Sequence, residues 1–532
     1  MATRWWPVAC SSFIAECVLR SAPDFERCFL DLALADIRDA STVVSLPGAS
    51  AIWSKCPAFV LEPERLEEFV PEAAEWRALG AITARVRSLL EGQAVWAISA
   101  RSRSGGLAEH LQSIVAYSRG AGVDARWGVI SANDDFFRFV RLLQDNLNGE
   151  GDDRAYGDAE RRLYEEQLAP ACEALSELLV PGDVVQLHDA PSAGLIPAVN
   201  DAGAYAIWNC RRGSEVVNDL ARRVREFLAP YTTRADACVF SRPQFVWDTG
   251  CGGRGHVIRP SVSPLSPKNQ ELGAAAVSAI LAAAGVQPGP STDGRVFTRL
   301  DGSPGRVDRN VQLLESGPLE PGTDVILQVS QWNRLNDPAT VIDWFADYLA
   351  SRTAAHLMLA GPDLEAVADD PRAPAILEQA IDRLRRLPDA LRARVHLATL
   401  PADDPEESAA LLNALERRSA IVLQQTRGGG FGMTVLESML KRRPVVCSRV
   451  GAFQDYVTDG VTGFLRDPDN PEGLADAAMQ LLANENLRER MGAAAQDRVR
   501  RHFLLPRELA DWASLIERLL ADAASTDSRD CR

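Results

Sequence analysis

Short, mainly apolar runs recur along this chain of 532 residues, and longer stretches with helical periodicity separate them. In the first half these runs are AVWAIS (95–100), DVVQLHD (183–189), AYAIWNC (204–210) and ACVFS (237–241). Neighbouring parallel strands need a long crossover connection, which is usually a helix. The alternation of strand and helix therefore predicts a parallel sheet built from βαβ units.

The same alternation begins again after a stretch between residues 265 and 320 that is rich in Gly, Pro and Ala. The later runs are DVILQVSQW (324–332), AHLMLAG (355–361), RVHLATL (394–400), SAIVLQQ (419–425) and RPVVCSRVG (443–451). Two such sets predict an α/β chain of two Rossmann-like, doubly wound domains. Ligands of doubly wound sheets bind beyond the carboxyl ends of the strands, so two facing sheets make an interdomain cleft.

The domain boundaries follow from these runs. Residues 63–255 are predicted to form the first domain and residues 256–505 the second. Residues 1–62 are an N-terminal extension that we expect to pack on the first domain. An amphipathic helix over residues 506–522 is expected at the domain junction, and residues 523–532 are expected to be a disordered tail.

Charge and composition exclude several classes of function. The chain carries 57 basic and 73 acidic residues, a net charge of −16, which disfavours general binding of nucleic acid or of anionic membranes. It has no signal peptide and no apolar run long enough to span a bilayer, so we expect a cytoplasmic protein. The ten cysteines include no C-x-x-C pair, which favours reduced thiols over a zinc site. We expect neither a metal nor a cofactor.

A glycine pair follows the first predicted strand, in SGGLAEHL (104–111). Gly105 and Gly106 would let the backbone approach a ligand, and the helix after them would point its first N–H groups at negative charge. A tight strand-to-helix turn without a ligand explains the same residues equally well.

A second glycine loop, GGGFGMT (428–434), stands between a predicted strand and a predicted helix. Gly430 and Gly432 flank the aromatic Phe431. The amides that would start the helix are placed where its dipole favours phosphate; they belong to Gly432, Met433 and Thr434. Glu437 would lie about one turn further along. Its carboxylate is either a ligand for the two hydroxyls of a ribose or an acid on the helix surface.

Taken together, the motifs of residues 63–505 resemble the retaining, GT-B-fold glycosyltransferases of the trehalose-synthase (glycosyltransferring) type. The motifs that carry the resemblance are SGGLAEHL, VVQLHDAPSAGLIPA, RPSVSPLSPKNQEL, VSQWNRLNDPATVIDWF, GGGFGMTVLESMLKRRPVV and DGVTGFL. The resemblance implies a nucleoside-diphosphate sugar in the cleft, bound mostly by the second domain, and a small hydroxylated acceptor such as glucose. It also implies retention of the anomeric configuration, no metal and, by analogy, a homodimer.

The resemblance also assigns roles to residues. Gly105 and Gly106 would face the donor phosphate, and Glu437 would hold the nucleotide ribose. His188 and Asp189 would lie on the first-domain side of the cleft, where a histidine that only caps the strand end is the alternative.

Several donor-site positions depart from the family pattern. An acid that grips the donor sugar is replaced by Gly429, and the basic residue before it by Gly428. An arginine and a lysine that neutralise the diphosphate are replaced by Gln331 and Asn336. Three further replacements lie on the first-domain side and in the linker, where a histidine, an acid and an aspartate of the family become Arg211, Gly213 and Ser263.

These losses have a large expected effect. A charge-assisted contact contributes about 1.5–3 kcal/mol, so losing two at a diphosphate costs roughly 3–6 kcal/mol. At tenfold per ~1.4 kcal/mol, this is about 10²–10⁴ in affinity. The same cations would also stabilise the leaving group as its charge develops. These replacements together predict a donor site that is either repurposed or disabled.

Three hypotheses are therefore open. We favour a glycosyltransferase with an atypical donor site, in which Arg334 and Arg427 join Gln331 and Asn336 at the donor and Arg211 joins His188 and Asp189 at the reacting centre. Positive charge would then come from new directions, supplied by Arg211, Arg212, Arg334 and Arg427. The alternatives are a pseudo-glycosyltransferase that couples a sugar-like or nucleotide-like substrate, and an inactive binding subunit.

Overall fold

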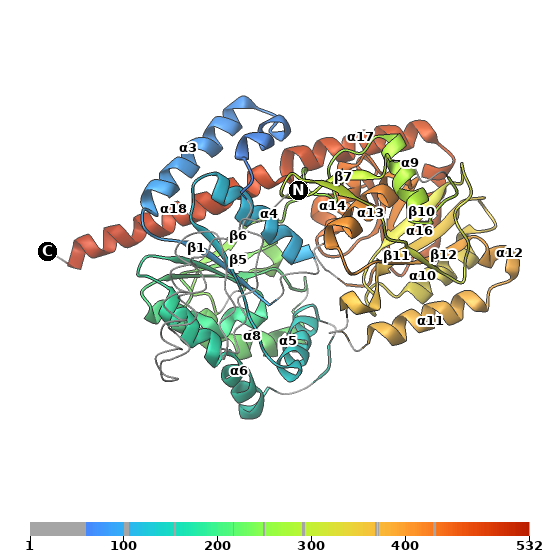
Figure 1. Cartoon of the computed structure of the whole chain (residues 1–532). Helices are drawn as coiled ribbons and strands as arrows, with labels where there is room; N and C mark the ends of the chain where they lie inside the picture. Colours follow the sequence, from blue (N-terminus) through green and yellow to red (C-terminus); the bar gives the residue numbers. More distant parts are fainter. Residues whose placement is uncertain are drawn as a thin grey trace, which may run out of the picture.

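A computed structural model of the protein describes residues 60–100, 106–149, 151–153, 156–215, 217–247, 250–289, 293–367, 370, 372–428 and 432–530, with side chains to residue 522. Two α/β halves lie side by side, and helix α18 (Leu505–Asp530) runs from the second half back across the first (Figure 1). None of the helices in these ranges is both long enough and apolar enough to cross a membrane.

The first half contains a six-stranded sheet of parallel strands in the order β2-β1-β3-β4-β5-β6. Its strands are β1 (Val95–Ser99), β2 (Ala125–Val129), β3 (Val184–His188), β4 (Tyr205–Cys210), β5 (Ala237–Phe240) and β6 (Gly255–Val257). Its helices are η1 (Pro63–Phe69), α3 (Ala73–Leu89), α4 (Gly106–Gly120), α5 (Asp134–Leu147), α6 (Asp158–Leu178), η2 (Ala190–Leu195), α7 (Ile196–Asp201), α8 (Asp219–Thr232) and η3 (Pro243–Phe245). The strand order reverses between β1 and β3.

The second half contains a seven-stranded sheet in the order β15-β14-β13-β10-β11-β12-β9, parallel except at β9 (Gln312–Leu314), which pairs antiparallel with β12. The other strands are β10 (Val325–Val329), β11 (His356–Pro362), β12 (Val395–Leu400), β13 (Ile421–Gln424), β14 (Val445–Ser448) and β15 (Gly463–Arg466). A separate hairpin, β7 (Val296–Thr298) and β8 (Pro304–Arg306), lies in the stretch between residues 265 and 320 that is rich in Gly, Pro and Ala. The order reverses between β10 and β13.

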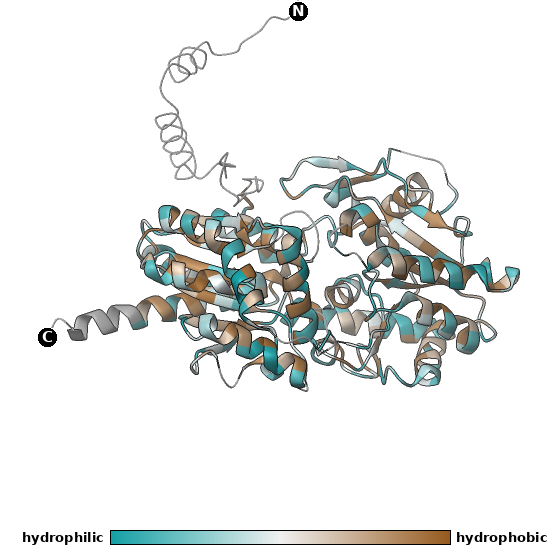
Figure 2. Cartoon of the chain, turned by 90° about the horizontal axis from the view of Figure 1, so that it is seen from below, coloured by the Kyte–Doolittle hydropathy of each residue, from teal (hydrophilic) through white to brown (hydrophobic). Residues whose placement is uncertain are grey.

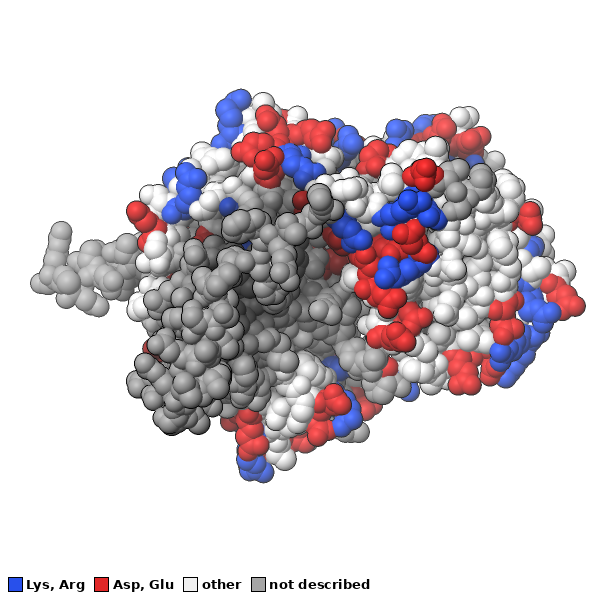
Figure 3. All heavy atoms as spheres, in the orientation of Figure 1, with Lys and Arg blue, Asp and Glu red and all other residues white. Residues whose placement is uncertain are grey.

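The second sheet is covered by helices α9 (Ala274–Ala283), α10 (Pro338–Trp344), η4 (Phe345–Leu349), η5 (Leu364–Val367), α11 (Ala373–Arg385), α12 (Asp389–Arg392), α13 (Pro405–Arg418), α14 (Met433–Leu440), α15 (Phe453–Tyr456), α16 (Pro471–Leu482) and α17 (Glu485–His502). Hydrophobic residues follow the strands inside each half, while hydrophilic ones alternate with them along the outer helices (Figure 2). Over the visible face of the second half, basic and acidic side chains are interspersed rather than separated by sign (Figure 3).

Local sequence explains where several helices begin. The side chain of Asn133 caps α5 by accepting a hydrogen bond from the Phe136 amide at 2.9 Å, and Asn218 caps α8 in the same way. A capping oxygen satisfies one of the first N–H groups of a helix, which have no acceptor inside it. Such starts can be read from the sequence without any tertiary information.

The prediction of two doubly wound, parallel-sheet domains is confirmed by these sheets, but two boundaries were wrong. The first sheet runs to Val257 in β6, so it extends beyond residue 255. Helix α18 continues to Asp530, so residues 523–530 are not the disordered tail that was expected. This stretch has no Gly or Pro to end the helix, and its alanines have high helix propensity. The N-terminal extension lies almost wholly outside the described residues.

Candidate active site

In both sheets the predicted site residues follow the strands at which the order reverses. Ligands of doubly wound sheets bind at such switch points, because the loops on either side turn away and leave a crevice. In the first half Gly106 follows β1, and His188 and Asp189 end β3. In the second half Gln331 and Arg427 follow β10 and β13. Topology alone therefore brings most of the predicted residues to the two sides of one cleft.

Asp189 adopts a backbone conformation that L-residues rarely take, with φ 60° and ψ −174°. This region is nearly exclusive to glycine and costs about 1–3 kcal/mol for other residues. The conformation is held by two hydrogen bonds: the Asp189 amide donates to the Asn209 carbonyl at 2.8 Å, and Asp189 Oδ1 accepts from the Arg211 amide at 2.9 Å. Strain of this kind is concentrated at functional sites.

His188 is buried beside Asp189, and its two ring nitrogens differ. Nδ1 accepts a hydrogen bond from the Asn209 side-chain amide at 3.3 Å, which places the proton on Nε2. Nε2 has no hydrogen-bond partner among the described residues. Burial, together with the positive charge of Arg211, holds the pKa of His188 well below its ordinary value, so the ring is neutral. A buried donor without a partner is typically satisfied by a ligand or an ordered water.

Arg211 is buried at 7% exposure and faces an acid from the far end of the chain. Its Nη2 lies 4.0 Å from Glu508 Oε1, and the same oxygen is 3.0 Å from His110 Nε2. Burial raises the pKa of Glu508, but His110 and Arg211 outweigh it and lower that pKa to about 2. The charge of Arg211 is thus neutralised inside the protein, which limits what it can offer a donor phosphate.

The second-half switch point is more open. Arg334 and Arg427 are exposed, and the Arg427 amide donates to the Leu335 carbonyl at 3.0 Å, so their two loops are bound together. Asn336, which stands where the family has a lysine, is held within its own loop. Its side-chain amide donates to the Gln331 carbonyl at 3.3 Å and to Asn333 Oδ1 at 2.9 Å. Of the four compensating arginines, Arg211 is therefore buried, Arg212 is half-buried, and the other two are exposed.

Helix α14 begins at the second glycine loop. Gly432 has φ 58°, and a Cβ there would stand 2.1 Å from the Phe453 ring, so only glycine fits. The amides of Met433 and Thr434 open the helix. A Cβ on Gly106 would lie 4.0 Å from Met433 Cγ, so the first residues of α4 and α14 lie next to each other at the cleft.

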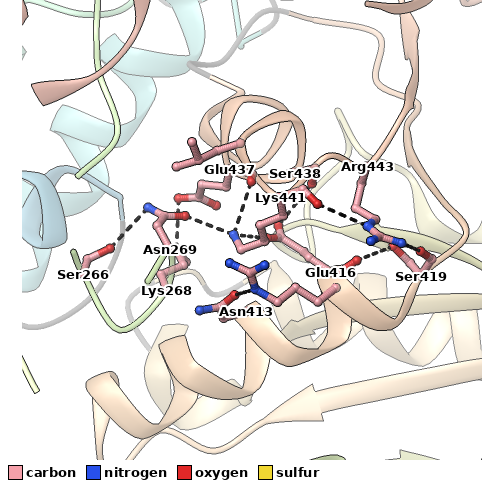
Figure 4. Close-up of polar contacts among 12 residues, drawn as sticks. Ser266, Lys268, Asn269, Asn413, Glu416, Ser419, Glu437, Ser438, Lys441 and Arg443 are labelled. Atoms are coloured by element: carbon pink, nitrogen blue, oxygen red, sulfur yellow. Dashed lines mark hydrogen bonds and ion pairs between the residues drawn. The ribbon is translucent and has the colours of Figure 1, made fainter. Parts of the chain in front are cut away.

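Glu437, the predicted ribose ligand, lines a pocket beside the start of α14, and its carboxylate already contacts Lys268 (Figure 4). Lys268 Nζ lies 3.6 Å from Glu437 Oε1 and 2.8 Å from Glu109 Oε2, so it links α14 to α4 of the first half. Burial raises the pKa of Glu437 to about 7, with Lys268 acting against the rise. The pocket, lined also by Gly106 and Met433, has a free volume of about 50 Å³.

A second buried ion pair lies at the C-terminal end of α14. Lys441 Nζ lies 2.5 Å from Glu416 Oε2 and 3.0 Å from Asn269 Oδ1 (Figure 4). Both charged side chains are almost completely inaccessible to solvent. The pair joins α13 and α14 to the linker, so it positions the helix that carries Glu437 rather than the ligand itself.

Ion pairs also join the two halves at other points around the cleft. Arg242 Nε lies 2.5 Å from Asp455 Oδ2, and Arg141 Nη1 lies 2.7 Å from Asp370 Oδ2. Together with the contact between Lys268 and Glu109, they link the two halves around the cleft. The pocket beside Glu437 and Lys268, at about 50 Å³, has room for a few water molecules.

One replaced family position has a structural explanation. A Cβ on Gly213 would stand 2.7 Å from the Phe245 ring, so the acid of the family has no room here. Ser263 is buried, and nothing in the structure explains why a serine stands at this position. The predicted site residues Gly105, Gly429, Gly430 and Phe431 lie outside the described residues.

The sequence prediction missed four residues that the structure places at the cleft: Glu109, His110, Lys268 and Glu508. Glu109 and His110 lie inside the SGGLAEHL motif, and Lys268 lies inside RPSVSPLSPKNQEL, so proximity to a motif was an available signal. Glu508 had only a weak one, an acid on a helix that packs on the core. Among the residues with described positions, no three His, Cys, Asp or Glu side chains are arranged to hold a metal ion.

Comparison with known proteins agrees with this geometry. Residues 97–247 match the family "Trehalose synthase, N-terminal domain", and residues 313–498 match "Glycosyl transferases group 1". A trehalose synthase of Thermococcus litoralis is 26% identical over 455 residues, which are 86% of this chain and 97% of the relative. A trehalose synthase of Rubrobacter xylanophilus is 29% identical over 419 residues, 78% of this chain and 88% of that protein.

Solved structures share the fold. The α,α-trehalose 6-phosphate synthase of Burkholderia multivorans superposes with a TM-score of 0.58 at 16% identity, covering 82% of this chain and 98% of the other. Anabaena HepE in complex with UDP-glucose superposes with a TM-score of 0.52 at 14% identity, covering 81% and 99%. With two parallel sheets facing one cleft, these matches identify the chain as a trehalose-synthase-like glycosyltransferase with the GT-B fold.

Proposed function

We propose that this glycosyltransferase takes a nucleoside-diphosphate sugar as its donor and transfers the sugar to a small polyhydroxylated acceptor. The observation that carries the proposal is the approach of Gly106 to Met433, with Glu437 in the same pocket. Two helix N-termini favour an anion between them, and a carboxylate one turn further along suits a ribose. Structures of HepE with UDP and with UDP-glucose support this class of donor.

In this proposal the amides of Gly432, Met433 and Thr434 bind the diphosphate, and Arg334 and Arg427 supply the positive charge that Gln331 and Asn336 lack. Glu437 accepts the two ribose hydroxyls once Lys268 has been released toward Glu109. The exchange is electrostatically balanced, because Lys268 keeps one carboxylate partner at 2.8 Å. Opening the contact between the halves makes room for the sugar.

The acceptor would bind on the first-half side, near His188 and Asp189. Neutral His188 offers its Nε2 proton to an acceptor or donor hydroxyl, and Asp189 fixes the loop around it. In the transfer, the bond between the anomeric carbon and the diphosphate oxygen breaks and a bond from the acceptor oxygen forms. The acceptor proton passes to the leaving diphosphate, and the anomeric configuration is retained.

A thermal-shift panel tests the proposal with nucleoside mono- and diphosphates, their glucose conjugates and sugar phosphates. A ligand at a hundred times its Kd adds about 2.7 kcal/mol of stability. We expect nucleoside diphosphates and their glucose conjugates to stabilise the protein, and Arg334→Ala/Arg427→Ala to weaken that binding about 10²-fold. Arg490→Ala, an exposed change on α17, is the matched control and should have no effect.

Silence across the panel would overturn the proposal. That outcome would favour an inactive binding subunit. One observation agrees with this alternative: Lys268 already forms an ion pair with Glu437, and the pocket around them has a free volume of only about 50 Å³. Stabilisation by monophosphates or sugar phosphates alone would instead favour a coupling enzyme that does not use ordinary donors.

A further inference from the structure

A second cavity lies in the first half, away from the cleft. Its volume is about 460 Å³, which is in the range of small-molecule sites (about 300–1,000 Å³). Helices α3 and α18 pack directly against each other on this side of the sheet, and Arg85 Nε of α3 lies 2.5 Å from Glu517 Oε1 of α18 (Figure 1). The cavity lies where this helix pair meets α4 and the strands β1, β2 and β3.

Small residues account for the empty space. The strands contribute Ala97 and Ala125 to the lining, and the helices contribute Gly80, Ala84 and Ala513. Protein interiors are otherwise close-packed, so residues without atoms beyond Cβ leave space unless a neighbour fills it. No neighbour does so at Gly80, where a Cβ would meet nothing within 4 Å. The cavity is therefore a consequence of the residue types on this face.

The rest of the wall is mainly apolar, and its charged residues are all exposed to solvent. Its larger apolar side chains are Trp76, Leu79, Ile114, Trp512 and Ile516. Water gains little from such a wall, and the lining loses dispersion contacts on its open side. An apolar molecule that enters the cavity restores those contacts and is itself removed from water. The lining therefore favours an apolar ligand.

One buried polar side chain interrupts this lining. Gln186 lies in the middle of β3, in register between Ala97 of β1 and Ile207 of β4, and it is only 5% exposed. It lines the cavity, and its side-chain amide forms no hydrogen bond with any residue that the structure describes. Buried polar groups are normally hydrogen-bonded, because an unpaired one costs stability. The amide therefore has a donor and an acceptor to offer to a ligand.

We propose that this cavity is a binding site for a small, mainly apolar molecule that carries one hydroxyl group. The apolar body of the ligand contacts Trp76 and Trp512, and its hydroxyl forms a hydrogen bond with the Gln186 side chain. Nucleotide sugars and free sugars do not suit this site, because most of their hydroxyls would have no partner on an apolar wall. The site is thus independent of the donor and acceptor sites.

Calorimetric titration of the full chain with para-butylphenol and with butylbenzene tests the proposal, since the two probes differ by one hydroxyl group. We expect both to bind, and para-butylphenol to bind about tenfold more tightly, because only its hydroxyl pairs with the buried amide. Gln186→Leu keeps the volume of the side chain and removes its polar group, so it should abolish this difference. Gln379→Leu, an exposed change on α11, is the matched control and should leave both affinities unchanged.

A second variant tests the space itself. Gly80 lines the cavity and has open space at its Cβ position, so we expect Gly80→Trp to fill part of the cavity and to weaken both probes at least about tenfold. Ala78→Trp adds the same side chain at an exposed position of α3 that does not line the cavity, and it should bind both probes as the unmodified protein does. Melting temperatures within a few degrees of the unmodified protein check that the variants are folded.

Three outcomes would overturn the proposal. The first is the absence of binding by either probe to the unmodified protein. The second is equal affinity for the two probes in the unmodified protein, or the same preference in Gln186→Leu, either of which would show that Gln186 does not contact the ligand. The third is undiminished binding in folded Gly80→Trp, which would place the probes elsewhere on the molecule.

Discussion

The two sides of the cleft differ in how their arginines are placed. On the first-half side Arg211 is 7% exposed, and its charge is balanced inside the protein by Glu508, which also contacts His110. On the second-half side Arg334 and Arg427 are exposed to solvent. Buried charges must be paired in advance because desolvation is costly, whereas exposed charges are free to reorganise around a ligand. The first-half side is therefore preorganised, and the second-half side is adaptable.

This difference fits the proposed division of labour. A preorganised side holds a small acceptor in one orientation, and orientation is a large part of catalysis. An adaptable side accommodates a large donor, and here it also has to exchange the contact between Lys268 and Glu437.

The largest effect is expected at Glu508. Glu508→Gln removes the buried carboxylate that faces His110 and Arg211, and leaving a buried charge unpaired costs about 3–5 kcal/mol of unfolding free energy. Urea unfolding measures the loss. Glu517→Gln on the same helix breaks an exposed contact with Arg85 and should cost less than about 1 kcal/mol. Equal effects of the two changes would contradict a preorganised first-half side.

Acid unfolding gives the same test a second measurement. The pKa of Glu508 is about 2 in the folded protein, below its ordinary value of 4.5. A lowered pKa stabilises the fold above the ordinary value, and that contribution is lost as the pH falls from 4.5 toward 2. Glu508→Gln should lack this part of the acid dependence.

A smaller effect, on rate rather than stability, is expected at Asp189. Asp189→Gly relieves the backbone strain at φ 60° but also removes the acceptor of the Arg211 amide. These two effects are of similar size, so the melting temperature should change little, while sugar transfer falls about 10²-fold through lost positioning. Transfer of labelled glucose from the most stabilising nucleotide sugar measures it. Glu315→Gly, which relieves φ 57° in a loop of the second half, is the control and should leave transfer unchanged. Full activity in Asp189→Gly would place the reacting centre elsewhere.

The smallest effect is expected at Glu437. Its pKa of about 7 is raised from 4.5, so its burial favours the fold at low pH and that advantage disappears as the pH rises through 7. The ionised form is the better acceptor for ribose hydroxyls. Between about pH 6 and pH 8, nucleoside affinity should therefore rise about tenfold in the unmodified protein and stay flat in Glu437→Gln. An uncharged nucleoside is the right ligand, since it adds no phosphate titration. Parallel pH profiles would remove Glu437 from the donor site.

Much of the fold was predictable because it depends on local periodicity. The strand runs at 95–100 and 183–189 correspond to β1 and β3, and each is followed by a helix. The expected fold of two doubly wound domains is confirmed, whereas the end of α18 was missed because no residue there signals it. The hairpin of β7 and β8 was also missed, since three-residue strands carry too little pattern.

The site was predictable only in part. Gly106, Asp189 and Glu437 could be named as candidates because glycine loops and strand ends have recognisable patterns, and their roles in a site remain predictions. Glu508, which faces both Arg211 and His110, could not be predicted, because it is 398 residues away from His110 in the sequence. Nor could the link from Lys268 to Glu437, which depends on how the linker lies against α14.

Local patterns in the chain are enough to specify two mainly parallel sheets with glycine loops at their strand ends, because strand and helix periods and turn residues act over short distances. Which charges are neutralised and which are left for a ligand depends instead on the packing of the folded chain. Strand order sets which loops meet. Burial moves the pKa values of His188 and Glu437, and the charged neighbours His110 and Arg211 lower that of Glu508. Both arise from contacts between distant segments, which no local pattern encodes.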